Sequence, residues 1–159
     1  MNTVIIGFDP GIADTGFGVI KKENGKLICL EYGSIKTSSK LSLSERLVIV
    51  YSSVQKIVKK HSPAVVCVEE LFFSKNVKTA MVVGQARGVV LLAIEQAGIP
   101  MIEFTPNQVK QAVSSYGSAA KDQVQRMVQM LLRLEDIPKP DDAADALAIA
   151  ICGSGGLSS

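Results

Sequence analysis

The stretch VIIGFDPGIADTGFGVI near the beginning of the chain constrains the fold more than any other. Val4 to Phe8 is a continuous apolar run, which predicts a buried strand, and Pro10-Gly11 directly after it is a turn signal. Asp9 stands between the two. A carboxylate at the edge of a buried strand is unfavourable unless a cation meets it. Three roles therefore stay open for Asp9: a turn cap, a nucleotide phosphate site acting through Mg²⁺, or a metal-bound catalytic carboxylate.

Residues 15–20 and 26–37 predict two more strands, and the Asn-Gly pair at 24–25 is a strong hairpin signal between them. Gly16 and Gly18 indicate a close approach or a bulge in the first of these strands. Further along, short apolar runs predict strands, and longer segments repeat apolar residues at helical spacing. The expected strands are 64–70 and 99–104, and the expected helices are 42–60, 77–97, 105–115, 118–134 and 141–152.

This order of elements indicates the α/β class, with a mixed β-sheet flanked by α-helices. Ser42 with Glu45, and Thr105 with Gln108, fit capping boxes at the starts of two helices. We expect a single domain over residues 1–152, followed by a flexible C-terminal tail, GSGGLSS, over 153–159.

The composition indicates the cellular compartment more than the function. A formal net charge of +2 is too small to argue for nucleic acid, so any basic face must come from uneven placement of the 17 Lys and Arg. The scattered Cys29, Cys67 and Cys152 have neither disulfide nor metal-ligand spacing, which favours a reducing cytoplasm. The first residues lack the pattern of a signal peptide, and no apolar run approaches the ~20 residues of a membrane helix. We expect a cytoplasmic protein without a membrane partner.

Other carboxylates also stand at the ends of expected elements. Glu69 ends a buried strand, as Asp9 does. Asp142 and Asp145 are three residues apart, and Asp141 and Asp145 four apart, so either pair shares a helix face. Spacing alone does not choose between these pairs. Asp141 could instead cap the helix, and acids at a helix start are favourable by about 0.3–1 kcal/mol each without any further role.

Taken together, these acids predict a metal site. Four carboxylates at one sheet edge would repel and raise each other's pKa unless divalent cations neutralise them. Oxygen ligands alone suit Mg²⁺ or Mn²⁺. Two such ions about 3.5–4 Å apart can activate water and stabilise the leaving oxygen of a phosphodiester.

The sequence closely resembles the RuvC family of Holliday junction resolvases. The stretches that carry the resemblance span nearly the whole chain in order: GFDPGIADTGFGVI, VCVEELFFSKN, GQARGV, QVKQAV, GSAAKDQVQRMV and DDAADALAIAI. It implies a ribonuclease H-like fold, and catalytic and metal-binding roles for Asp9, Glu69, Asp142 and Asp145, which settles Asp142 over Asp141. Two departures are Glu70, where relatives commonly lack an acid, and a tail shorter than in many relatives.

The same resemblance implies an activity and partners. The expected enzyme is a homodimeric crossover junction endodeoxyribonuclease with two Mg²⁺ ions per site, for which Mn²⁺ can substitute. It would make paired symmetric nicks in four-way DNA junctions and leave 5′-phosphate and 3′-hydroxyl ends, in recombination and repair. The RuvA–RuvB branch-migration complex is the expected protein partner.

Candidate DNA-binding residues lie shortly after Glu69 or on later helices. The resemblance assigns base stacking at the junction to Phe72, whereas Phe73 could equally close the core. Lys75 stands beside them. Lys110 and Lys121 match family lysines that face the scissile strand.

Arg87 is open between a DNA contact and a helix surface. Three rival functions remain: a phosphotransferase of the actin and sugar-kinase kind, a ribonuclease H-like enzyme acting on another nucleic acid, and a junction-binding scaffold without catalysis. The short chain disfavours the first because such enzymes need a second lobe, and retention of all four acids disfavours the last.

Overall fold

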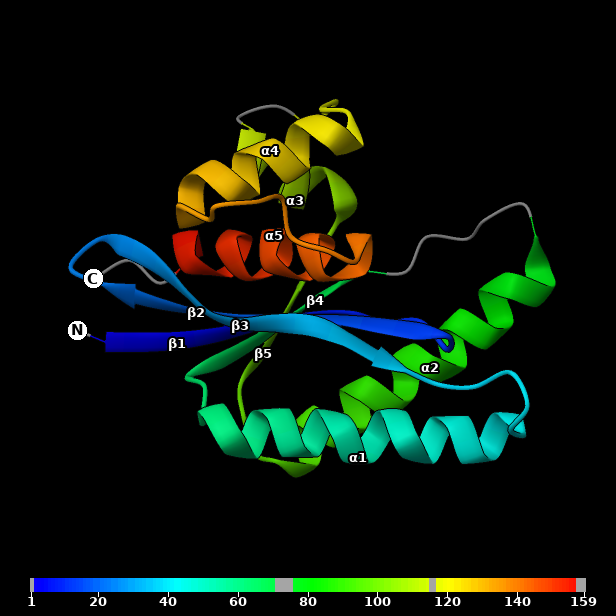
Figure 1. Ribbon diagram of the computed structural model, residues 1–159. Coiled ribbons are helices and arrows are strands. Elements are labelled where there is room, and N and C mark those ends of the chain that lie inside the picture. Colours follow the sequence, from blue (N-terminus) through cyan, green and yellow to red (C-terminus); the bar gives the residue numbers. More distant parts are fainter. Residues whose placement is uncertain (1, 71–75, 115–116, 157–159) are drawn as a thin grey trace.

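The computed structural model describes residues 2–70, 76–114 and 117–156. A five-stranded mixed sheet runs through the middle of the molecule, in the order β3-β2-β1-β4-β5 (Figure 1). β1 pairs antiparallel with β2 and parallel with β4, and β4 pairs parallel with β5. The strands are β1 (Asn2–Asp9), β2 (Asp14–Glu23), β3 (Lys26–Lys36), β4 (Val65–Glu69) and β5 (Met101–Phe104).

Helices cover both faces of the sheet, which confirms the α/β class. α1 (Leu43–His61) and α2 (Val77–Gln96) pack on one face. On the other face α5 (Asp141–Gly156) lies directly on β1 and β2, with α3 (Pro106–Ser114) and α4 (Lys121–Leu132) beyond it (Figure 1). Ile5 packs in the α5 core and Ile6 in the α1–α2 core, so β1 is buried on both faces. The continuous apolar run at the start of the chain is the sequence of such a strand.

The local signals for helix starts and the hairpin are confirmed. Ser42 and Glu45 form a reciprocal capping box at α1. Thr105 and Gln108 exchange the same pair of bonds before α3, at 2.8 and 3.1 Å. Residues 24 and 25 have φ angles of 50° and 76°, as the turn between β2 and β3 requires.

Close approach of α5 to the sheet depends on glycines. A Cβ atom on Gly16 would lie 2.0 Å from the carbonyl oxygen of Asp142, and one on Gly7 would lie 2.1 Å from that of Ala146. Side chains at these two positions would therefore force the helix away from β1 and β2. The close approach expected at Gly16 and Gly18 is confirmed at both, since a Cβ atom on Gly18 would lie 2.7 Å from the Leu147 side chain. The β2–β3 register shift lies between Val19 and Ile20, directly after Gly18.

Two sequence expectations need correction. α5 continues to Gly156 with Ser154 buried, so the domain extends beyond residue 152 because the last turn of the helix still packs on the fold. α2 spans 20 residues with a mean hydropathy of 1.5, so within the described residues one helix is long and apolar enough to cross a membrane by length and composition. The sequence expectation that no run approaches this length was wrong, because Arg87 and Glu95 interrupt the run without removing its apolar character. Only 28% of this apolar window is buried, so one face of α2 remains exposed.

Candidate active site

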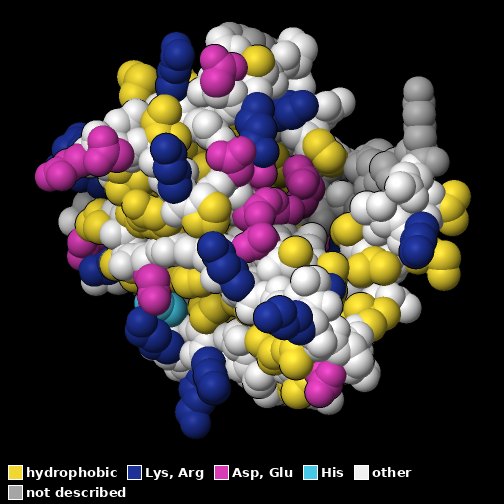
Figure 2. All heavy atoms as spheres, turned by 45° about the vertical axis from the view of Figure 1, so that its right-hand side comes forward, with side chains coloured by type: hydrophobic (Ala, Val, Ile, Leu, Met, Phe, Trp, Pro, Cys, Tyr) yellow, Lys and Arg dark blue, Asp and Glu magenta, His cyan; other side chains and the backbone are white. Residues whose placement is uncertain are grey.

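Three carboxylates from two elements meet where β1 ends. Asp9 is the last residue of β1, and Asp142 and Asp145 lie in the first turns of α5. One oxygen of each lies within 4.8 Å of the others. Figure 2 shows acidic side chains gathered at the centre of this face, with lysine and arginine side chains beside them. Three oxygens this close have the spacing needed to bind one divalent cation.

The turn after β1 is stabilised by Thr15. The buried Thr15 hydroxyl donates a 2.6 Å hydrogen bond to the carbonyl of Gly11 and accepts a 3.3 Å bond from its N–H. The turn is therefore closed without the side chain of Asp9. Of the roles left open for Asp9, the turn cap has the least support.

Glu69 lies beside this trio at the end of β4. It is outside the group of mutually close oxygens, but its charge raises the pKa of Asp9. It lines two clefts, one of about 260 Å³ shared with Asp145 and one of about 300 Å³ shared with Asp9. The structure thus brings all four predicted acids to one region, with Glu69 between the two clefts.

Burial, and then neighbouring carboxylates, disfavour ionisation of the four acids. The pKa of Asp9 is raised from 3.8 to about 8, first by burial and then by the neighbouring acids, Asp145 foremost. Burial followed by nearby carboxylates also raises the pKa values of Glu69, Asp142 and Asp145. Crowded carboxylates of this kind favour a proton or a cation among them.

Two lysines flank the acids, and both are residues that the sequence singled out. Lys121, the first residue of α4, lies 3.6 Å from Asp145. Burial alone would lower the pKa of Lys121, but the charges of Asp145 and Asp141 raise it above its ordinary value. Both lysines line the cleft that contains Glu69 and Asp145, and Lys110 on α3 lowers the pKa of Glu69.

Asp141 stands apart from the trio. Its side chain pairs with Lys121 at 3.4 Å and accepts a 3.2 Å bond from Gln125. It is 64% exposed, against 32% for Asp145. The alternative role of Asp141 as helix cap is excluded, because the carbonyl of Pro140 accepts the first helical bond and Asp141 is already helical.

Other predicted residues have different outcomes. Phe72, Phe73 and Lys75 lie outside the described residues. Arg87, which the sequence left open, lines the cleft that contains Asp9 and Glu69, and it pairs with Glu103 on β5. Sequence reasoning missed Glu103, since an isolated acid in a short strand carries no signal of its own.

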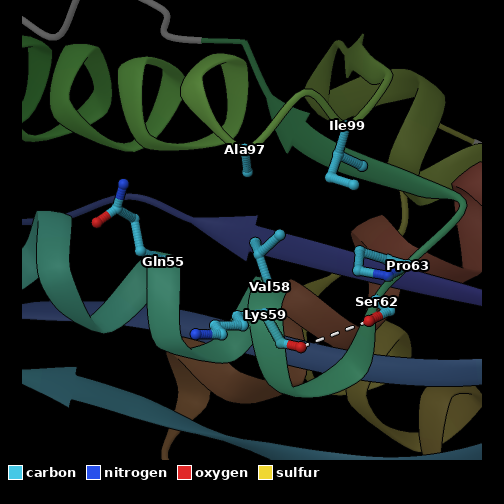
Figure 3. Close-up of a pocket in the computed structure, with 7 residues that line it drawn as sticks. All are labelled: Gln55, Val58, Lys59, Ser62, Pro63, Ala97 and Ile99. Carbon is cyan, nitrogen blue, oxygen red and sulfur yellow. Dashed lines mark hydrogen bonds between the residues drawn. The ribbon is translucent and has the colours of Figure 1, made fainter.

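A separate cavity of about 490 Å³ lies between the end of α1 and the turn after α2 (Figure 3). Val58 and Ile99 form part of its apolar wall, and Lys59 contributes the single charged side chain among the described residues that line it. Because no carboxylate lines it, this cavity lacks the chemistry of the acid site.

The donor set fits a hard divalent metal ion. Carboxylate oxygens are the ligands that Mg²⁺ and Mn²⁺ prefer, and soft or nitrogen ligands are missing from the acid cluster among the described residues. The family model described as crossover junction endodeoxyribonuclease RuvC matches residues 5–153. The chain belongs to the RuvC family.

Comparisons with individual RuvC proteins agree with this assignment. The RuvC crossover junction endodeoxyribonuclease of Halothermothrix orenii is 56% identical over 149 residues, which are 94% of this chain and 90% of that protein. Thermus thermophilus RuvC in complex with Holliday junction substrate is 39% identical with a TM-score of 0.90, covering 96% of this chain and 93% of that one. The yeast mitochondrial Holliday junction resolvase shares the fold alone, at 14% identity and TM-score 0.65, covering 93% and 77%. The ribonuclease H-like fold expected from the sequence is confirmed.

Proposed function

We propose that this chain is a Holliday junction resolvase, a metal-dependent endodeoxyribonuclease that makes paired symmetric nicks in four-way DNA junctions. The observation that carries the proposal is the convergence of Asp9, Asp142 and Asp145 at one sheet edge in a member of the RuvC family. The similarity to Thermus thermophilus RuvC, whose structure contains a Holliday junction substrate, supports the choice of DNA.

Asp9, Asp142, Asp145 and Glu69 are the residues that would hold Mg²⁺, with two ions per site and Mn²⁺ as a substitute. When bound, these ions supply Lewis acidity and an activated water for phosphodiester hydrolysis, leaving 5′-phosphate and 3′-hydroxyl ends. The raised pKa values of the four acids support this role, because a cation would relieve their mutual repulsion.

The chain's own cations would bring the DNA backbone to these acids. Lys110 and Lys121 line one cleft together with Glu69 and Asp145. Their charges offset the carboxylates, which would otherwise repel a phosphate. In this proposal Phe72, with Phe73 and Lys75 beside it, contacts the bases and backbone near the junction centre, since these residues lie within six positions of Glu69 in the chain.

The proposed working unit is a homodimer that uses the outer face of α2. Val77, Met81 and Leu92 on this face are 70%, 64% and 50% exposed, and a Cβ on Gly88 would meet only open space. Their spacing places them on one side of the helix. Large exposed apolar side chains in a row are typical of a protein interface. We also propose a cytoplasmic location and, by family resemblance, assembly with the RuvA–RuvB complex.

Cleavage of a synthetic four-way junction, compared with linear duplex and an RNA–DNA hybrid of the same sequence, tests the proposal. We expect Mg²⁺-dependent paired nicks in the junction and little cutting of the other two. Preferential cutting of the hybrid would indicate a different ribonuclease H-like activity. Tight junction binding without cutting in Mg²⁺ or Mn²⁺ would indicate a scaffold.

A further inference from the structure

Arg87 lies beside the acid site, where α2 meets the strands β4 and β5. It belongs to α2, and its side chain is only 16% exposed. It lines the cleft that also contains Asp9 and Glu69. A guanidinium is costly to bury unless its donors are used, so its partners indicate its role.

The side chain of Arg87 connects α2 to both β4 and β5. Its Nε atom donates a 3.4 Å hydrogen bond to the main-chain carbonyl of Glu69, and its Nη2 atom pairs with the carboxylate of Glu103. Glu103 lies opposite Val68 in the β4–β5 ladder. One guanidinium therefore ties the helix to two neighbouring strands at once.

The hydrogen bond from Arg87 to Glu69 lies where β4 stops pairing with β1. The β1–β4 ladder ends at the pair Phe8–Val68, one residue before Glu69. On the other side Glu69 still pairs with Phe104, whose carbonyl also accepts a 2.7 Å bond from the N–H of Glu70. Beyond the end of the β1–β4 ladder, Arg87 thus supplies a hydrogen bond to the main-chain carbonyl of Glu69.

The two contacts require the shape of arginine. A guanidinium presents its donors in a fixed planar fork, so Nε and Nη2 can serve a carbonyl and a carboxylate together. A lysine ammonium at the same place keeps the charge but not the fork.

We propose that Arg87 is a positioning residue that fixes the Glu69 carboxylate by holding the main chain at the end of β4, with Glu103 as the partner that orients its guanidinium. The inference rests on the proposed resolvase function. It differs from a DNA contact, in which the guanidinium would bind a phosphate and contribute directly to affinity.

The test compares Arg87→Gln, Arg87→Lys and Glu103→Gln with wild type, and Lys56→Gln on α1 serves as an exposed charge-loss control. Three quantities are measured: the single-turnover rate of junction cleavage in Mg²⁺, the Kd for the junction in EDTA over a range of salt, and Mn²⁺ binding by electron paramagnetic resonance without DNA. Melting curves show whether each variant is folded.

We expect Arg87→Gln and Arg87→Lys to cleave about 10- to 100-fold more slowly, as expected for a displaced catalytic group. Glu103→Gln should cleave the junction several-fold more slowly than wild type, and Lys56→Gln should cleave it at the wild-type rate. Junction Kd and its salt dependence should stay within twofold of wild type, whereas Mn²⁺ binding should weaken in both Arg87 variants. Glu103→Gln keeps the arginine, so it tests the idea even if an Arg87 variant does not fold.

Other results would overturn the inference. Wild-type cleavage by Arg87→Lys, combined with weaker binding and a salt slope reduced by about 0.9 in Arg87→Gln, would identify a phosphate contact instead. Wild-type cleavage rates and wild-type Mn²⁺ binding in every variant would show that Arg87 does not position the Glu69 carboxylate. Failure of the proposed function would appear differently, as absence of junction cleavage by the wild-type protein itself.

Discussion

The Nζ atom of Lys121 lies 3.6 Å from Oδ2 of Asp145, so the first residue of α4 partly neutralises an acid of α5. Lys121 lowers the pKa values of both Asp145 and Asp9, yet both remain raised. One lysine is therefore too little positive charge for this cluster. The remaining imbalance makes the stability of the protein depend on pH and on divalent ions.

Without metal, the folded protein should lose stability as pH rises from about 4 to about 8. In the unfolded chain Asp9 ionises near 3.8, whereas in the folded protein it ionises near 8. Between these values the folded state holds the extra proton, so unfolding becomes more favourable with rising pH. Melting temperatures in EDTA from pH 5 to pH 9 measure this decline. Asp9→Asn should flatten it, and an equally steep decline in that variant would place its origin elsewhere.

Mg²⁺ should raise the melting temperature more at pH 8 than at pH 6. A proton and a metal ion compete for the carboxylate of Asp9, which is about half ionised at pH 8 but almost wholly protonated at pH 6. The measurement is a pair of melting curves with and without Mg²⁺ at each pH. Asp9→Asn is the control and should show little stabilisation at either value. Equal stabilisation of wild type and variant would mean that the ion binds elsewhere.

Asp9→Asn should abolish junction cleavage while leaving junction binding largely intact. The substitution keeps the shape but removes a charged ligand, and phosphate contacts elsewhere supply most of the affinity. Cleavage assays and binding titrations on one purified protein separate the two effects. The matched control is Asp141→Asn, which should cleave almost normally because this exposed acid lies outside the trio. Loss of activity in the control would reverse the choice between Asp141 and Asp142.

Phe72→Ala distinguishes a base contact from a core position. If the ring stacks on junction bases, the change should cost roughly 1–3 kcal/mol of binding and leave the melting temperature unchanged. A core ring would instead cost roughly 3–5 kcal/mol of stability. Junction titrations together with a melting curve decide, and a large fall in melting temperature would exclude the DNA role.

Mixed dimers test whether two symmetric sites act on one junction. A two-fold dimer offers two acid sites related by symmetry, as two matching cuts require. Wild-type subunits mixed with excess Asp9→Asn subunits on a supercoiled cruciform should give single nicks and few linear products. A monomeric nuclease would only be diluted, with its product pattern unchanged.

Leu92→Glu on the α2 face should yield folded monomers by light scattering, whereas Met130→Glu, which changes an exposed methionine of α4, should remain dimeric.

The sequence predicted the elements well because their signals are local. The helical spacing of apolar residues, the capping boxes and the Asn-Gly turn each depend on neighbours within a few residues, and all were confirmed. The acids were individually weak signals, since spacing could not show which helical pair faces Asp9. Choosing Asp142 required the resemblance, and its proximity to Asp9 required the folded chain.

Sequence reasoning missed the contact between Arg87 and Glu103. Arg87 and Glu103 are 16 positions apart and meet only because α2 packs beside the end of β4. The end of α5 was also misjudged, since the Gly-Ser composition of 153–156 suggests a flexible tail, yet tertiary packing keeps Gly153 and Ser154 helical and buried.

The glycine contacts between α5 and the sheet have a consequence for motion. In many enzymes the reactive groups sit on the parts that open most readily, but here two acids begin a helix seated against backbone with no room for a methyl group. Amide hydrogens in the middle of α5 and along β1 should therefore exchange with solvent among the slowest in the protein. We therefore expect any movement that admits DNA to come from other segments and to leave the distance between Asp9 and Asp145 nearly constant.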